Sequence, residues 1–443
     1  MLAALRLFLA RRFVDFPVVA EEARRLLALT KAADTAHLGL SEDLRAAAFI
    51  SLGITEMWAL RFEDAERHLN QGVALARRIG RPYLEFTGLT HGAHAMLLSR
   101  PDASDASADW SKQAIALAEQ HGWGGEPLAG VAYAQLGTVL LYQGRLAEAE
   151  PWLERAERTQ RTEVEPAAGM SLRYARAVLE LARGRPQEAL AAFRAAEKLA
   201  AELVTPHTYV TSMRSHMVQT LVRLGQTGPA EQALAELGED ERASGEMRTA
   251  VAALRLAAGE PQAAADALAP VLDASISGVR RTQMATALLL EARARQALGD
   301  QAAAGRALER ALDVTESSGI VLPFLLDPAP ALLERHRQHR TAHSSAHSAL
   351  ISQILDLLSG SGGLGEIVPP RITEELTDSE TRVLRYLPTH LTTHEIANEL
   401  FLSENTVNTH KRHLYAKLGA HRRHEAVDRA RALGLLAPSA RRA

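Results

Sequence analysis

The sequence has no cysteine, few aromatic residues and no long apolar run. The absence of cysteine excludes disulfides, thiolate zinc sites and cysteine nucleophiles, and it fits the reducing cytoplasm, where we expect the protein to act. No apolar stretch approaches the ~18 residues of a membrane span, so we expect no membrane partner. Aromatic residues make up 5% of the 443 residues, while alanine is abundant. This composition favours an all-α fold of closely packed helices over β-sandwiches or barrels.

Motifs of enzyme chemistry are also missing. The sequence has no phosphate-binding GxxxxGK[ST] pattern and no evident nucleophile–base set, so we predict a protein that is not an enzyme and needs no cofactor. Four histidines, His336, His339, His343 and His347, follow one another at helical spacing. Because no carboxylate or thiol joins them in the pattern, we predict no metal site there.

Charge is unevenly spread along the chain, whose formal net charge is −3. Residues 371–443 hold twelve Lys and Arg against nine Asp and Glu, which leaves 38 against 44 in the preceding 370 residues. Within this tail, residues 404–424 combine five basic residues and four histidines with a single acid. A positive field on so short a segment is typical of a surface that binds phosphates.

Residues 1–320 carry a recurring pair of glycine and alanine. Glycines end apolar runs at Gly144, Gly184, Gly225, Gly259 and Gly299, and an alanine follows each by five residues, at Ala149, Ala189, Ala230, Ala264 and Ala304. Glycine accepts the left-handed conformation that ends a helix, and alanine lets the next helix approach closely. Repetition at this period indicates stacked helical hairpins. We therefore predict an α-solenoid that resembles tetratricopeptide repeats and serves as a sensor or interaction domain.

A second register lies inside the repeats. Arg173, Arg214 and Arg248 each stand eleven residues before one of the glycines. On evenly stacked hairpins these arginines would form a row that binds anions or carboxylates, a candidate ligand site. The alternative is a set of helix-face salt bridges, such as one between Arg248 and Glu246.

The composition changes after the repeats. Residues 321–370 are rich in Pro, Ser and His and include SGSGGLG at 359–365, so we expect a linker there. Residues 371–437 are predicted to form a second helical domain, and residues 438–443 a disordered tail.

Capping signals place the helices of this second domain. Thr377 with Glu380 and Thr392 with Glu395 match the capping box, and Ser403 suits an N-cap. The expected helices are 378–387, 393–400, 404–418 and 424–433. A short helix, a tight turn and a longer polar helix are the parts of a helix-turn-helix, which lays its last helix in the major groove of DNA.

The polar side chains of helix 404–418 suggest which residues contact DNA. We expect Asn408 to pair with adenine, Arg412 with guanine, and the Thr409 methyl to meet a thymine methyl. The expected phosphate contacts are Ser403, Asn405, Thr406, His410, Lys411, Lys417 and Arg423.

This segment resembles the LuxR/FixJ-type helix-turn-helix. The matching residues are Leu376, Thr377, Glu380, Val383, Leu384, Leu391, Glu395, Ile396, Ala397, Leu400, Ser403, Thr406, Val407, His410, Lys417, Leu418, Gly419, Arg423, Glu425, Ala426 and Val427. Two positions depart from the family pattern. His390 replaces the usual glycine between the first two helices, and Asn408 replaces a frequent lysine, so the family's base preference does not carry over at position 408.

The repeats are similar to those of the large MalT-like regulators, through segments such as RRIGRPYLEF and SGIVLPFLLD. That resemblance implies an NTPase module ahead of the repeats, but the sequence has no Gly-Lys pair, so nucleotide-driven switching is not expected. Whether an NTPase segment precedes Met1 in a longer chain stays open.

Together these features predict a bacterial-type transcriptional regulator. Its repeats would sense a small-molecule or protein effector, and its tail would bind a double-stranded DNA operator. One module contacts few base pairs, so we expect a homodimer on DNA, with RNA polymerase as a further candidate partner. The alternative is an adaptor or scaffold that uses the helix-turn-helix for protein contact. A steep loss of affinity with rising salt would distinguish the DNA reader.

Overall fold

The computed structural model describes most of the chain. The described residues are 16–32, 38–59, 61–99, 104–161, 166–203, 209–276, 279–339, 347–359, 376–389, 391–400 and 402–418, with Ala420, Arg423, Ala426, Val427 and Ala430. Within these ranges every regular element is a helix, which confirms the predicted all-α fold. The chain divides into two compact units, a repeat unit (Met1–Gly363) and a C-terminal unit (Leu364–Ala443).

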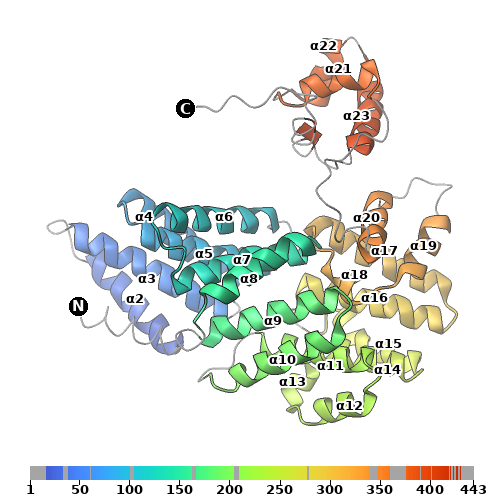
Figure 1. Ribbon diagram of the computed structural model, residues 1–443, viewed down its shortest axis with the longest axis horizontal. Helices are drawn as coiled ribbons and strands as arrows, with labels where there is room; N and C mark the ends of the chain where they lie inside the picture. Colours follow the sequence, from blue (N-terminus) through green and yellow to red (C-terminus); the bar gives the residue numbers. More distant parts are fainter. Residues whose placement is uncertain are drawn as a thin grey trace. The chain divides into compact units, whose positions relative to one another are not determined.

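The repeat unit is a stack of helical hairpins (Figure 1). Its first helices are α2 (Phe16–Ala32), α3 (Leu38–Trp58), α4 (Phe62–Arg78), α5 (Pro82–Ser99), α6 (Ser104–Gln120), α7 (Pro127–Tyr142), α8 (Leu146–Thr159), α9 (Pro166–Ala182) and α10 (Pro186–Ala200). They continue with α11 (Val210–Arg223), α12 (Thr227–Ala235), α13 (Glu239–Ala243), α14 (Gly245–Ala257), α15 (Pro261–Leu272), α16 (Arg281–Ala297) and α17 (Gln301–Ser318). Neighbours along the chain pack as pairs, for example α7 on α8 and α16 on α17. Several of these helices begin at a proline, whose fixed φ suits the first helical position.

The predicted glycine and alanine pairs form the turns of this stack. All five glycines adopt left-handed backbone, with φ between 71° and 83°. At Gly144 the following amide of Arg145 donates to the Leu140 carbonyl at 2.9 Å, which completes the helix end. The five alanines are at most 1% exposed against the preceding helix. The tetratricopeptide-like solenoid is therefore confirmed, together with the turn chemistry that predicted it.

The expected linker at 321–370 differs from the structure. Three helices lie in that range: α18 (Leu322–Leu326), α19 (Pro330–His339) and α20 (Ser348–Leu358). Phe324, Ile351 and Ile354 are buried with residues of α16 and α17 in one hydrophobic core. The predicted flexible stretch at 359–365 lies almost wholly outside the described residues. Burial of apolar side chains thus makes 322–358 part of the repeat unit.

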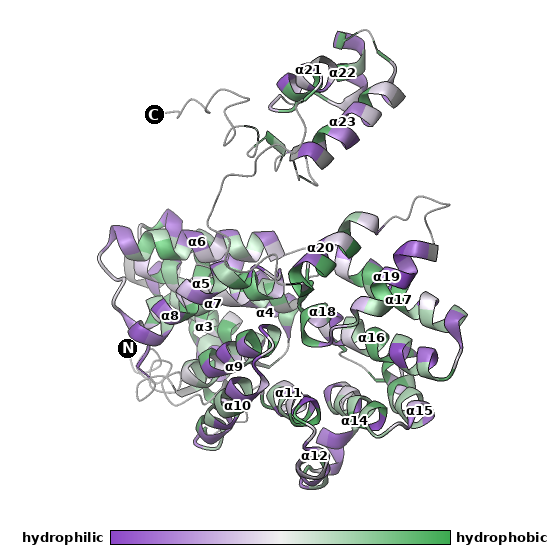
Figure 2. Ribbon diagram, turned by 45° about the vertical axis from the view of Figure 1, so that its right-hand side comes forward, coloured by the Kyte–Doolittle hydropathy of each residue, from purple (hydrophilic) through white to green (hydrophobic). Residues whose placement is uncertain are grey.

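Helix α18 also joins parts of the repeat unit that are far apart in sequence. It packs against α9 and α16, and the Val321 amide donates to the Tyr142 carbonyl at 3.0 Å. Leu322 and Leu326 belong to the same core as Tyr133 and Phe193. Figure 2 shows α18 as a largely hydrophobic segment. The last helices of the repeat unit therefore fold back on its middle hairpins and close the superhelix.

The C-terminal unit contains α21 (Asp378–Tyr386), α22 (Thr393–Leu400) and α23 (Glu404–Leu418). Its core is built from Val383, Leu384, Leu387, Ile396, Ala397, Leu400, Val407, Leu414, Ala420, Ala426, Val427 and Ala430. The fourth expected helix, 424–433, lies mostly outside the described residues, as do residues 438–443. Of the expected segment, Ala426, Val427 and Ala430 are helical and buried.

No helix among the described residues is both long and apolar enough to cross a membrane.

Candidate functional site

Three short polar motifs fix the helices of the C-terminal unit. The Thr377 amide donates to Glu380 Oε2 at 2.8 Å, and the Glu380 amide donates back to Thr377 Oγ1. Thr392 and Glu395 repeat this exchange at the start of α22. Ser403 Oγ accepts from the Thr406 amide at 3.1 Å and caps α23. Both predicted capping boxes and the predicted N-cap are confirmed, and they define where the last helix begins.

The outer face of α23 presents the side chains expected to read bases. Asn408, Thr409 and Arg412 are exposed, while Val407 and Leu414 on the opposite side are buried. Among the described residues, the side chains of Asn408 and Arg412 form no hydrogen bond or ion pair with another residue. Their amide and guanidinium groups are therefore available for an external partner.

Several residues expected to contact phosphates make contacts at the helix ends. Ser403 and Thr406 hydroxyls lie 2.7 Å apart within the cap, and Lys411 Nζ donates to Thr393 Oγ1 at 2.9 Å. Burial, with Arg423 nearby, lowers the pKa of Lys411. His410 is half-buried on the same helix, and the side chain of Asn405 lies outside the described residues. These groups lie along α23, near the exposed side chains that are expected to read bases.

Lys417 is held inside the C-terminal unit. Its Nζ lies 2.9 Å from Glu380 Oε2, and the carboxylate side chain is only 4% exposed. Burial acts to raise the pKa of Glu380, but Lys417 and the capping hydrogen bonds together bring it below its usual value. The pair links α23 to α21, so the structure gives Lys417 a partner within the fold where the sequence predicted a phosphate.

Arg423 is also engaged within the unit. Its guanidinium donates to the backbone carbonyls of Leu387 at 2.9 Å, Leu391 at 2.5 Å, Tyr386 at 3.1 Å and Thr389 at 2.9 Å. These carbonyls flank the turn between α21 and α22. The predicted departure at His390 falls in this turn but outside the described residues. Arg423 therefore stabilises the turn through these hydrogen bonds. The sequence predicted a phosphate contact for Arg423 and did not predict this structural role.

The three arginines of the repeat register have different surroundings. Arg173 is exposed on α9, Arg214 forms ion pairs with Glu197 at 3.3 Å and Glu241 at 2.9 Å, and Arg248 donates to the Ala243 carbonyl. Arg214 thus follows the salt-bridge alternative. The suggested pair of Arg248 with Glu246 is wrong, because the Glu246 carboxylate instead binds Arg280, on the neighbouring hairpin, at 2.8 Å.

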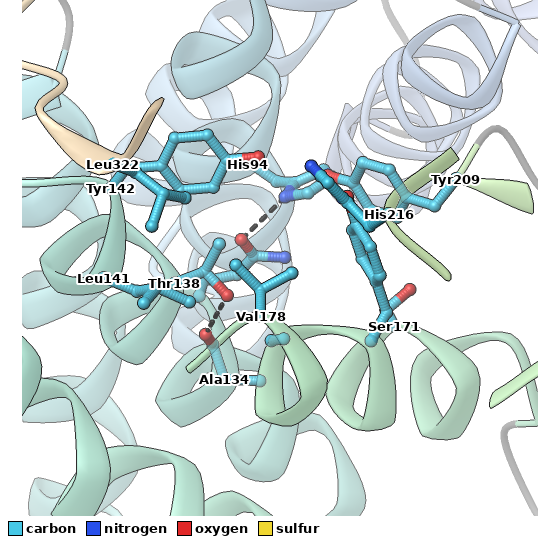
Figure 3. A pocket seen from close by; sticks show the side chains of 13 residues that line it. His94, Ala134, Thr138, Leu141, Tyr142, Ser171, Val178, Tyr209, His216 and Leu322 are labelled. Carbon is cyan, nitrogen blue, oxygen red and sulfur yellow. Dashed lines mark hydrogen bonds between the residues drawn. The ribbon is translucent and has the colours of Figure 1, made fainter. Parts of the chain in front are cut away.

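A second candidate site is a cavity inside the repeat unit. Two adjoining hollows of about 40 and 60 Å³ share Tyr142, Tyr174, His216 and Leu322 in their walls. One water needs roughly 10–15 Å³ in this measure, so the hollows have room for several waters or a small organic molecule. Figure 3 shows side chains from α5, α7, α9 and α11 converging there, with Leu322 from α18 beside them.

Hydrogen bonds between uncharged side chains connect residues in the wall of the first hollow. His94 Nδ1 lies 2.7 Å from Gln135 Oε1, and His94 Nε2 lies 2.5 Å from the Tyr209 hydroxyl. Burial lowers the pKa of His94 and of His216 to about 4, so both imidazoles are neutral near pH 7. Nδ1–H of His94 then donates to Gln135, and Nε2 accepts from Tyr209.

Sequence reasoning missed this cavity, although a signal was present. Ala134, Tyr174, Ser215 and Thr249 stand ten residues before successive repeat glycines, one position beyond the arginine register, and all four line the hollows. The register that lines the interior was therefore adjacent to the one that carries the arginines.

An α-solenoid of helical hairpins followed by a helix-turn-helix unit defines a class of protein, the repeat-containing DNA-binding transcriptional regulators. The family models agree with this architecture. Residues 1–339 match the MalT-like TPR region, and residues 374–430 match the bacterial regulatory proteins of the luxR family. The chain belongs to the MalT-like TPR family and carries a LuxR-family DNA-binding domain.

Known proteins resemble separate parts of the chain. It is 30% identical over 166 residues to the HTH-type transcriptional regulator MalT of Vibrio cholerae, a match of 33% of this chain and 18% of the relative. It is 43% identical over 61 residues to the Fimbriae Z protein of Escherichia coli K12, a match of 14% of this chain and 29% of the relative. The chain thus spans less than a third of the length of each of these relatives.

A solved structure resembles the repeats. A crystal structure of Rap protein complexed with competence and sporulation factor superposes with a TM-score of 0.51 at 14% identity, covering 70% of this chain and 83% of that chain. At this identity the likeness supports the helical-repeat fold alone.

Proposed function

We propose that the protein is an effector-responsive regulator that binds an operator sequence in the cytoplasm. The repeat unit would bind a small molecule or a protein, and α23 would read the major groove as part of a homodimer. Exposed Asn408, Thr409 and Arg412, on one face of a capped helix, are the observation that supports sequence-specific DNA binding. The cavity lined by helices of the repeat unit supports the sensing role.

Within this proposal the contacts fall into two groups. Asn408 and Arg412 would specify bases, and the groups around the start of α23, such as Lys411, would position the phosphate backbone. Lys417 and Arg423 would act indirectly, since their contacts within the unit hold the helices that present the reading side chains. We therefore expect them to affect the stability of the unit more than base preference.

Operator binding can be tested by fluorescence anisotropy with the full chain. Genomic fragments that it selects would serve as probes, and affinity would be measured across a salt series. Arg412→Ala should cost about 1–3 kcal/mol on the best site and relax preference at one base pair. Arg385→Ala is the matched control, because Arg385 is also exposed but lies on α21. Equal effects of the two changes, or affinity independent of salt, would favour the adaptor alternative.

A further inference from the structure

A partly buried ion pair lies in the wall of the second hollow. Arg280 Nη2 approaches Glu246 Oε1 to 2.8 Å, and the two side chains are 19% and 23% exposed. Arg280 Nη2 also donates to the Ser212 hydroxyl, and Gln283 Nε2 donates to the other carboxylate oxygen at 3.3 Å. Within the described part of the chain, Nε and Nη1 of Arg280 have no protein partner. Arg280 therefore lines the second hollow while keeping guanidinium donors that the described fold does not use.

Tyr142 adds a second unused donor. Its side chain lines both hollows, and Figure 3 shows its hydroxyl directed into the space between the labelled side chains. None of the described residues forms a hydrogen bond with this hydroxyl. Burial raises the pKa of Tyr142, which keeps the phenol protonated as a donor. The hydroxyl borders both hollows and has no partner among the described residues, so a ligand or water there can complete its hydrogen bonding.

The charges of the cavity restrict the ligand. A simple anion drawn to Arg280 would meet the carboxylate of Glu246 in the same wall, and a simple cation would meet the guanidinium. A molecule that carries both charges can satisfy both groups. A neutral polyol would need neither charged group. It would therefore give no reason for the fold to keep two charges away from bulk water, which is costly. Tyr174, which faces both hollows, adds an aromatic surface suited to an ammonium group.

We infer that this cavity binds a small zwitterion of the α-amino acid class, with its carboxylate on Arg280 and Tyr142 and its ammonium on Glu246. The inference rests on the proposed sensing function of the repeat unit. The ligand is small because the two hollows offer only about 40 and 60 Å³, with Leu322 in the wall of both.

Calorimetric titration of the full chain with individual α-amino acids tests this site. We expect saturable binding of at least one amino acid. Its methyl ester, which lacks the carboxylate, and its N-acetyl derivative, which lacks the ammonium, should bind at least about tenfold more weakly. Propionate and glycerol serve as probes for a simple anion and a polyol, and neither should match the amino acid.

Variants locate the site. Arg280→Gln and Tyr142→Phe should each weaken amino acid binding by about tenfold or more. Arg183→Gln is a matched control, because Arg183 is 17% exposed and paired with Glu150 outside the cavity. Tyr133→Phe is the second control, since its hydroxyl donates to the Gly124 carbonyl. Tyr142→Phe keeps the ring and tests the site even if Arg280→Gln fails to fold.

Three results would overturn the inference: no amino acid binds, propionate or glycerol binds as tightly, or the Arg280 and Tyr142 variants bind normally. Operator affinity measured with and without the bound amino acid separates this inference from the proposed function. Binding that leaves operator affinity unchanged would support the site and count against sensing through it. An operator response to glycerol alone would support sensing and refute the ligand class.

Discussion

The closure of the superhelix by α18 can be tested at a single glycine. Gly144 has φ +76°, and an added Cβ would lie 2.5 Å from Val321 Cγ2 and 3.0 Å from Leu357 Cδ1. Gly184 is its matched control, because it has φ +73° at the equivalent turn of the next hairpin and nothing within 4 Å of an added Cβ. Alanine at either position meets the same backbone penalty, but only at Gly144 does it meet the segment that folds back.

The structure sets the size of the two effects. An alanine in left-handed backbone costs about 1–2 kcal/mol, which is the expected loss for Gly184→Ala. Overpacking a filled contact costs about 1–3 kcal/mol more. We therefore expect Gly144→Ala to lower the free energy of unfolding by about 2–5 kcal/mol. Val321→Ala removes the clashing methyl group, so the double variant Gly144→Ala/Val321→Ala should recover part of that difference.

Urea unfolding followed by tryptophan fluorescence measures this difference. All four tryptophans, Trp58, Trp110, Trp123 and Trp152, lie in the repeat unit and report on it alone. Equal losses for Gly144→Ala and Gly184→Ala, with no interaction between positions 144 and 321, would refute the packing of α18 on this turn. The repeats would then be an open solenoid in solution.

Four further predictions concern charged and titrating groups. Arg423→Met should lower the free energy of unfolding of the C-terminal unit by about 3 kcal/mol in urea, monitored by far-UV circular dichroism, since hydrogen bonds from charged groups contribute about 1.5–3 kcal/mol each and these are partly exposed. An unchanged midpoint with a smaller salt slope of DNA binding would support a phosphate contact instead. Lys417→Met should destabilise the same unit by about 3 kcal/mol, because it leaves Glu380 buried without its cation. The contribution of Glu380 to the free energy of unfolding is present above the usual carboxyl pKa, and it is lost as pH falls through the lowered pKa of the folded state. Unfolding temperatures measured across a pH series would show this loss. The pKa values of His94 and His216 fall from 6.5 to about 4 on folding. The free energy of unfolding of the repeat unit should therefore rise with pH across this interval. At about pH 5 each histidine should lower it by about 2 kcal/mol relative to neutral pH. His94→Gln and His216→Gln should each make unfolding temperature less dependent on pH, and an unchanged pH profile would show that neither histidine is buried and neutral.

The repeats were predictable because their signal is local. Gly184 and Ala189 stand five residues apart and fold into one turn, so sequence spacing alone predicts their left-handed and buried states. The packing of α18 depends on Val321 reaching Tyr142, almost 180 residues earlier in the chain. Proline, serine and histidine around this segment suggested a linker, and no local periodicity records the distant surface that buries it.

The C-terminal unit shows the same difference at single residues. The capping box at Thr377 involves a partner three residues away, and its geometry matched the prediction. Arg423 carries a charge that suits phosphate equally well, but its partners are carbonyls more than thirty residues earlier. Residue type and family pattern therefore identified Arg423 as important without specifying the partner of its guanidinium.

Sequence reasoning missed the cavity because the residues that line it stand one position beyond the arginines in each repeat. A step of one residue turns a side chain by about 100° around a helix, enough to move it from the outer edge of a hairpin to the interior. Arg214 at the first position pairs with glutamates at the surface, while Ser215 at the next position lines a hollow. A cation in the interior needs a counter-charge, and Arg280 has one in Glu246. Arg280 stands outside both registers, so only the folded arrangement of neighbouring hairpins brings it to the cavity wall. The position ten residues before each repeat glycine therefore predicts residues in the walls of such a site. The repeat pattern does not predict Arg280, the residue that would give the site its chemical selectivity.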